Sequence, residues 1–193
     1  MNATTGSLAE MVNQSIVVLT RPSVQTFEMY EKRGTTQSAL IYVGVAAAVA
    51  GIVAFVFGLL GGIGSAIGAL LGAILAPLIG FAVFSFLLFY IGRSQGGTGT
   101  QDEVFYTASL YAAPILAING AVGNIPLIGC LFLPVSLILG LYQIYLAYLG
   151  TRASQNLDQN KAILTIVLAW VAQFVAVLVV GAIVGGTLIA ANN

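Results

Sequence analysis

The chain has 193 residues, of which 59% are hydrophobic and 6% are charged, with six basic and six acidic side chains. A soluble domain carries roughly a quarter charged residues, so these few charges cannot cover a water-facing surface. The composition therefore indicates an integral membrane protein. The chain contains no histidine, which excludes a Ser/His hydrolase and a metalloenzyme whose metal is held by histidine.

Residues 1–38 are predicted to form a cytoplasmic or interfacial segment. Ser7 and Glu10 have the spacing of a capping box, and apolar residues then recur at helical spacing at Leu8, Val12, Ile16 and Leu19. We predict a helix over residues 7–19 that lies on the membrane surface. A second short helix is expected over residues 23–33, with Gly34 as its C-cap.

Five apolar segments follow, and each is long enough for a membrane crossing, which needs about 20 residues. The predicted crossings are residues 39–60, 65–91, 104–122, 126–149 and 162–190. Asp158 is a suitable N-cap for the last one, while Pro114 and Pro134 are expected to kink the third and fourth. The predicted fold is an all-α membrane protein, in which residues 39–190 form a bundle of five transmembrane helices preceded by short cytoplasmic amphipathic helices.

The basic residues predict the orientation of the chain, because cytoplasmic loops carry an excess of Lys and Arg. With the N-terminus in the cytoplasm, all six fall on the cytoplasmic side: Arg21, Lys32, Arg33, Arg93, Arg152 and Lys161. Tyrosines gather at the same predicted helix ends, as in an aromatic belt, at positions Tyr42, Tyr90, Tyr106 and Tyr148. The C-terminus is then expected on the opposite side.

The second predicted crossing carries a small residue at every fourth position, namely Gly64, Gly68, Gly72, Ala76 and Gly80. Such a row lets another helix backbone approach closely. The favoured interpretation is packing within the chain, for which Gly44, Gly51 and Gly58 of the first crossing offer a partner. The alternative is an interface with another subunit.

Three amide side chains are predicted at membrane depth, Asn119, Gln143 and Gln173. A transporter could line a pathway with them, whereas the plainer interpretation is hydrogen bonding between helices. The predicted crossings contain no Asp, Glu, Lys or Arg, so a proton relay or an intramembrane ion pair has no candidate residue. This argues against an ion-coupled carrier.

Residues 96–100, Gly-Gly-Thr-Gly-Thr, superficially suggest a phosphate-binding loop, but they lack its Gly-Lys-Ser/Thr ending. A flexible connector is the preferred interpretation. Asp102 and Glu103 are expected to stabilise a helix N-terminus, and Cys130 is expected to be a packing residue. The sequence therefore predicts no catalytic residue, no metal site and no cofactor.

Several short motifs resemble the Yip1 family of five-span membrane proteins over about residues 20–180. They are Arg21-Pro22 followed by Phe27, the 96–100 segment leading to Tyr106, Tyr111 and Ala113-Pro114, the segment Ile125-Pro126-Leu127-Ile128-Gly129, and Leu157 with Lys161-Ala162. The resemblance implies a cytoplasmic N-terminus, five spans and a very short tail on the far side. It supplies no catalytic residues.

Eukaryotic members of that family are linked to Rab GTPases and vesicle traffic. Here the N-terminal region is short and the Asp-Leu-Tyr-Gly-Pro type segment of those members is missing, so Rab binding is not carried over. The chain looks more like bacterial or archaeal members, which implies a prokaryotic cytoplasmic membrane.

Our leading hypothesis is a non-enzymatic scaffold or accessory subunit that acts through helix contacts with a larger membrane complex or by organising lipid. The expected partners are membrane lipid and other integral membrane proteins or further copies of the chain, and no nucleic acid. One alternative is a small-solute or lipid transporter or channel, and another is a trafficking adaptor like the eukaryotic members.

Overall fold

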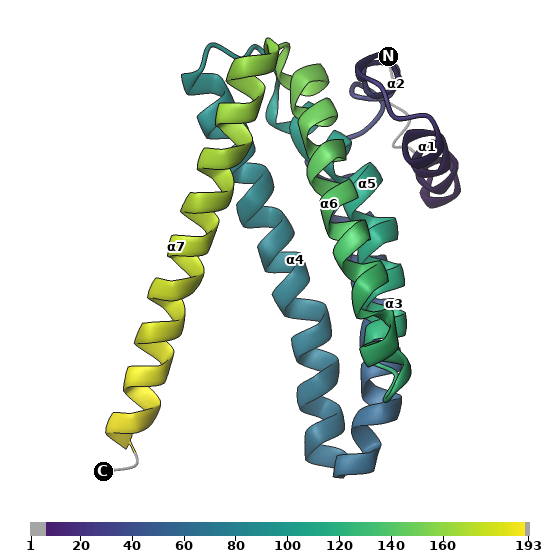
Figure 1. Ribbon diagram of the computed structural model, residues 1–193, viewed down its shortest axis with the longest axis vertical. Coiled ribbons are helices and arrows are strands. Elements are labelled where there is room, and N and C mark those ends of the chain that lie inside the picture. The colour runs from purple at the N-terminus through teal and green to yellow at the C-terminus, as the bar shows by residue number, and fades with distance from the viewer. Residues whose placement is uncertain (1–6, 192–193) are drawn as a thin grey trace.

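The computed structural model describes the backbone of residues 7–191 and the side chains of residues 7–175 (Figure 1). Within this part, all regular structure is helical. The elements are α1 (Leu8–Thr20), α2 (Val24–Glu28), α3 (Thr36–Gly58), a 3-10 turn (Leu59–Gly61), α4 (Ile63–Ser94), α5 (Gln101–Gly123), α6 (Ile128–Gln155) and α7 (Gln159–Ala191).

Four of these helices are long and apolar enough to cross a membrane, namely α3 with its 3-10 turn, α4, α5 and α6. The predicted crossings fall on these helices, with ends that differ by a few residues. Helix α7 has 33 residues and covers the fifth predicted crossing, although the side chains of residues 176–190 lie outside the described part. A multi-pass helical membrane protein is therefore confirmed, while the count of five crossings stays a prediction.

Helices α3, α5 and α7 begin where hydroxyl or carboxyl side chains satisfy free backbone N–H groups. Thr35 and Thr100 both form capping boxes, with Ser38 and Glu103 respectively. Asp158, the predicted N-cap, accepts a hydrogen bond from the Lys161 backbone N–H at 3.0 Å. Helices α5 and α6 continue through Pro114 and Pro134, so these prolines interrupt neither helix.

Two predictions about the shorter segments were wrong. Helix α2 ends at Glu28 instead of residue 33, with Met29 as its C-cap, so Gly34 does not cap it. The ring of Tyr106 occupies the space that a side chain at position 34 would need. Helix α6 extends to Gln155, beyond the predicted end of the fourth crossing. Gln155 is fully buried and donates to the carbonyls of Leu88 and Phe89 at 3.4 and 3.3 Å.

Helix α5 lies at the centre of the molecule, and its first half supplies the largest buried side chains. Phe105, Tyr106 and Leu110 are each at most 1% exposed. They pack in one apolar cluster with residues of α1, α3 and α6. Phe27 of the α2 segment joins this cluster through an edge-to-face contact with Tyr111, at 6.2 Å between ring centroids.

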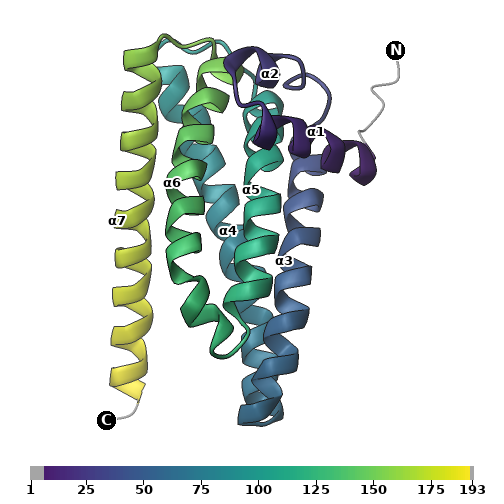
Figure 2. The same ribbon diagram turned by 45° about the vertical axis from the view of Figure 1, so that its right-hand side comes forward.

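Helix α1 runs across the ends of α3 and α5 (Figure 2), and polar side chains attach it there. The Tyr106 hydroxyl donates to Gln14 Oε1 at 2.9 Å, and the hydroxyls of Ser15 and Tyr42 lie 2.9 Å apart. Three members of the predicted apolar row point away from the bundle and are about half exposed, Leu8, Val12 and Ile16. The exposed side of α1 therefore carries an apolar row beside the exposed Glu10 and Asn13, whereas its buried side contains hydrogen-bonding groups.

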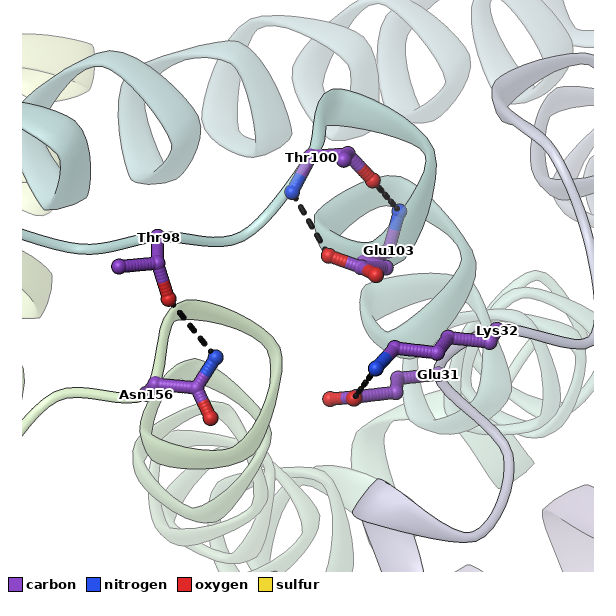
Figure 3. A network of polar contacts seen from close by, with 6 residues as sticks. All are labelled: Glu31, Lys32, Thr98, Thr100, Glu103 and Asn156. Atoms are coloured by element: carbon purple, nitrogen blue, oxygen red, sulfur yellow. Dashed lines mark hydrogen bonds and ion pairs between the residues drawn. The ribbon is translucent and has the colours of Figure 1, made fainter.

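The segment of residues 96–100 is docked on the end of α6 and is not the free connector that we predicted. The Thr98 backbone N–H donates to the Gln155 carbonyl at 3.0 Å, and Asn156 Nδ2 donates to Thr98 Oγ1 at 2.9 Å (Figure 3). A Cβ atom at Gly99 would collide with the carbonyl oxygen of Ser154. Close backbone approach therefore explains a glycine here without a phosphate ligand.

Replacement of Gly99 by alanine tests this close approach. The added methyl group meets backbone atoms that cannot rotate away, so we expect Gly99→Ala to lower the free energy of unfolding by about 1–3 kcal/mol. The control is Gly68→Ala on α4, where a Cβ meets open space and helix propensity favours alanine. Thermal unfolding in detergent compares the two variants, and equal stabilities would contradict the docked arrangement.

Glu31 is a buried carboxylate at the same end of the molecule (Figure 3). The residue is 7% exposed, its Oε1 lies 3.6 Å from Lys32 Nζ, and its Oε2 has no hydrogen-bond partner among the described residues. Burial and the negative charge of Glu103 raise the pKa of the Glu31 carboxyl above its ordinary value. Folding therefore favours the protonated form of this side chain.

This raised pKa predicts a pH-dependent effect of Glu31→Gln. The stability that protonated Glu31 confers is present below the ordinary pKa of glutamate and is lost as the pH rises through the raised value. Glutamine is neutral at both pH values, so we expect it to raise the Tm more at pH 7 than at pH 4. Glu10→Gln removes the same charge at an exposed position that does not contribute to the raised pKa of Glu31 and serves as control. A gain that is larger at pH 4 would refute the assignment.

Candidate functional site

The three predicted intramembrane amides line one cavity of about 280 Å³. Asn119 comes from α5, Gln143 from α6 and Gln173 from α7. Residues of α3 and α4 complete the wall, including Val43 and Pro77. The cavity lies near the middle of the long helices, so the polar residues found from the sequence converge in space.

The amides differ in how far the protein satisfies them. Asn119 Oδ1 accepts a hydrogen bond from Ser136 Oγ at 3.1 Å. Gln173 Nε2 donates to the Gly80 carbonyl at 3.5 Å, which is long for such a bond. The Gln143 side chain makes no hydrogen bond within the described part of the chain. In hydrocarbon, an unpaired amide costs several kcal/mol, so the cavity offers hydrogen-bonding capacity that the described residues do not use.

The remaining wall is mostly aliphatic, with four aromatic side chains. Phe81, Phe84, Tyr111 and Trp170 contribute rings, and Phe84 meets Trp170 edge to face at 6.4 Å between centroids. None of the lining residues carries a charge. The site is therefore suited to an uncharged molecule with both an apolar and a hydrogen-bonding part.

The cavity reaches the outer surface of the bundle at its rim. Trp170 is 50% exposed and Ile144 is 37% exposed, although both line the cavity. Helix α7 lies near α4 at the end that carries the α4–α5 and α6–α7 connections and separates from it toward the C-terminus (Figure 1). If α7 crosses the membrane as predicted, this rim faces lipid and not water.

The small-residue row of α4 is largely exposed. A Cβ added at Gly64, Gly68 or Gly72 would meet no atom of the described side chains within 4 Å, and Ala76 is exposed. Only Gly80 lies against another helix, because Gln173 of α7 approaches it. Among the described side chains none packs on these three glycines, so both packing within the chain and an interface with another subunit stay predictions for them.

The predicted partner glycines on α3 pack instead against larger residues of α4. Gly51 faces Ile74, and Gly58 faces Ala66, whereas Gly44 faces open space. The contact between α3 and α4 thus uses small residues on α3 and a different face of α4. The rotation of α4 about its axis leaves its own glycine row on the outside of the bundle.

Sequence reasoning missed two features of the site. It gave no role to Pro77, although this residue lines the cavity from within α4. It also did not foresee the aromatic walls, because Phe84 and Trp170 are unremarkable in apolar segments. Among the described residues, no three His, Cys, Asp or Glu side chains are grouped as a metal site would require.

The fold and the site define a class of protein: a multi-pass helical membrane protein with an uncharged cavity among its helices. The model of the Yip1 domain family matches residues 16–181. This is most of the chain, so the protein belongs to the Yip1 domain family, as the sequence motifs indicated. Comparison with curated proteins and with solved structures found no match.

Proposed function

We propose that this Yip1-domain protein is a non-enzymatic membrane protein that organises lipid by holding a membrane-dissolved molecule in the cavity. The observation that carries the proposal is the convergence of Asn119, Gln143 and Gln173 on one apolar cavity. Membership of the family fits a membrane-embedded role without catalysis. The unused hydrogen-bonding capacity of Gln143 supports a ligand over a purely structural role.

We further propose that the chain crosses a prokaryotic cytoplasmic membrane five times, with the N-terminus in the cytoplasm. The support comes from the six Lys and Arg residues, since all belong to segments at the end of the bundle where α1 and α2 lie (Figure 2). Cytoplasmic ends carry such an excess. The outward apolar row of α1, Leu8, Val12 and Ile16, would rest on the bilayer at that interface.

The proposal predicts a bound molecule after gentle extraction from the native membrane. Native mass spectrometry should find a small molecule on the wild-type protein. The triple change Asn119→Leu, Gln143→Met and Gln173→Met keeps the side chains near their original size, removes their hydrogen-bonding groups and should reduce the bound fraction roughly tenfold or more.

A matched control makes the same kinds of change at exposed positions, Gln25→Met, Gln159→Met and Asn160→Leu. It should retain the bound molecule at the wild-type level. Equal occupancy in both triple variants would mean that the cavity does not hold the molecule. If purified protein alone moved a solute across liposomes at a rate that depends on the protein, the transporter alternative would replace a purely organising role.

The second candidate function is that of an accessory subunit or scaffold, and the exposed glycine row of α4 favours it. Gly64, Gly68 and Gly72 leave a strip of backbone that another membrane helix can approach closely. The partner would be another integral membrane protein or a second copy of the chain. The adaptor alternative, by contrast, rests on the family resemblance alone.

Gly68→Leu tests the accessory role, because it fills the strip without disturbing contacts inside the chain. We expect the assembly that contains the Gly68→Leu variant to have a lower mass than the wild-type assembly, when both are extracted in mild detergent and measured by light scattering. Gly140→Leu is a matched control, since position 140 on α6 also faces open space. An unchanged assembly in the Gly68 variant, or the same loss in both variants, would argue against this interface.

A further inference from the structure

We propose that the cavity binds the uncharged, carbonyl-bearing head of a neutral lipid, while the apolar chain of that lipid leaves past Trp170 into the bilayer. This inference rests on the proposed function, because it names the chemical class of the molecule that the cavity would hold. It concerns binding, and it holds whether or not the molecule is also moved across the membrane.

The hydrogen-bonding groups of the wall favour carbonyl oxygens on the ligand. The oxygen of Asn119 is already engaged by Ser136, which leaves its NH₂ group as a donor. Gln143 keeps a complete amide, and Gln173 Nε2 makes only the 3.5 Å contact with Gly80. A carbonyl oxygen accepts such N–H donors without offering a proton of its own. The wall therefore offers amide N–H donors from two or three residues to acceptor oxygens of a ligand, beside the acceptor oxygen of Gln143.

The absence of charge in the wall excludes a phosphate head. The lining residues contribute amide, hydroxyl, aromatic and aliphatic groups, and no Lys or Arg. An ionised group without a partner is costly in an apolar environment. The basic residues Arg93 and Arg152 belong to the last turns of α4 and α6, well away from the middle of the helices. An anionic phospholipid would therefore keep its head at the interface and outside the cavity.

The size and the rim of the cavity favour entry of a head alone. Its volume of about 280 Å³ lies just below the roughly 300–1,000 Å³ of sites that enclose whole drug-sized ligands. A long lipid chain must then remain outside, and the half-exposed Trp170 marks a lateral exit. Rings of Phe81, Phe84 and Trp170 offer flat surfaces for a planar head.

Two kinds of membrane lipid share this chemistry, the prenylquinones and the neutral glycerides. A quinone presents two carbonyls on a flat ring, and a diglyceride presents two ester carbonyls. Both are uncharged and both carry apolar chains. The experiment therefore includes one probe of each kind, together with an anionic lipid that has the same chains as the glyceride probe.

Trp170 supplies the signal, because it is the one tryptophan in the chain and it lines the cavity. The full-length protein is placed in phosphatidylcholine nanodiscs with increasing fractions of decylubiquinone, brominated diacylglycerol or brominated phosphatidylglycerol. Each probe quenches tryptophan on contact. A bound probe gives a component of quenching that saturates as the fraction of probe increases. Collisions with probe in the surrounding bilayer give quenching that keeps rising with that fraction.

We expect saturable quenching of wild-type protein by at least one neutral probe and only the unsaturated rise with phosphatidylglycerol. The triple variant Asn119→Leu, Gln143→Met and Gln173→Met should weaken the apparent affinity roughly tenfold or more. The control triple variant at residues 25, 159 and 160 should bind as wild type does. Gln143→Met alone is the second test, because it breaks no hydrogen bond of the described structure and should still weaken binding measurably.

The outcomes separate the chemical class from the proposed function. Saturation by the quinone alone or by the glyceride alone identifies the source of the carbonyl head. Saturation by phosphatidylglycerol as tight as that by the neutral probes overturns the neutral class but leaves lipid binding intact. If no probe saturates and a molecule still co-purifies with the native protein, the neutral-lipid class is wrong, whereas the proposed function stands. If no probe saturates and nothing co-purifies, the inference and the proposed function both fall.

Discussion

The satisfaction of polar groups without water is the constraint on which this structure depends. Inside hydrocarbon a backbone N–H or C=O group has no solvent partner, so the chain forms helices that pair these groups internally. Side-chain amides face the same requirement. Asn119 meets it through Ser136 and Gln173 meets it weakly through Gly80, whereas Gln143 is left to the cavity. Several other polar side chains also lack a partner among the described residues, but Gln143 is the one that faces the cavity.

The same constraint applies at the end of the bundle near α1 and α2, where more polar side chains are present. Residues that carried the family resemblance are structural there: Phe27 packs on Tyr111, and Tyr106 anchors α1 through Gln14. Thr98 pairs with the end of α6. These contacts tie the N-terminal segment and the α4–α5 connection to α5 and α6. Helices α5 and α6, which these contacts join to the N-terminal segment and the α4–α5 connection, also line the cavity.

Helix α4 presents different faces to different environments. One face packs on α3 through Ala66 and Ile74, another contributes Pro77 and Phe81 to the cavity, and the row of Gly64, Gly68 and Gly72 is left open. Small residues thus serve two purposes in this chain. On α3 they permit close packing within the bundle, and on α4 they leave backbone accessible from the membrane.

The sequence by itself determined the membrane class, the approximate position of the long helices, the family and the three amides, because apolar length and charge act locally along the chain. It could not determine which way each helix faces. Helices that are apolar all round give no amphipathic signal for their rotation. Only the tertiary structure decided that Asn119, Gln143 and Gln173 share a cavity, that the α4 glycines point outward, and that Gly99 lies against Ser154, since each depends on how one helix is turned against its neighbours.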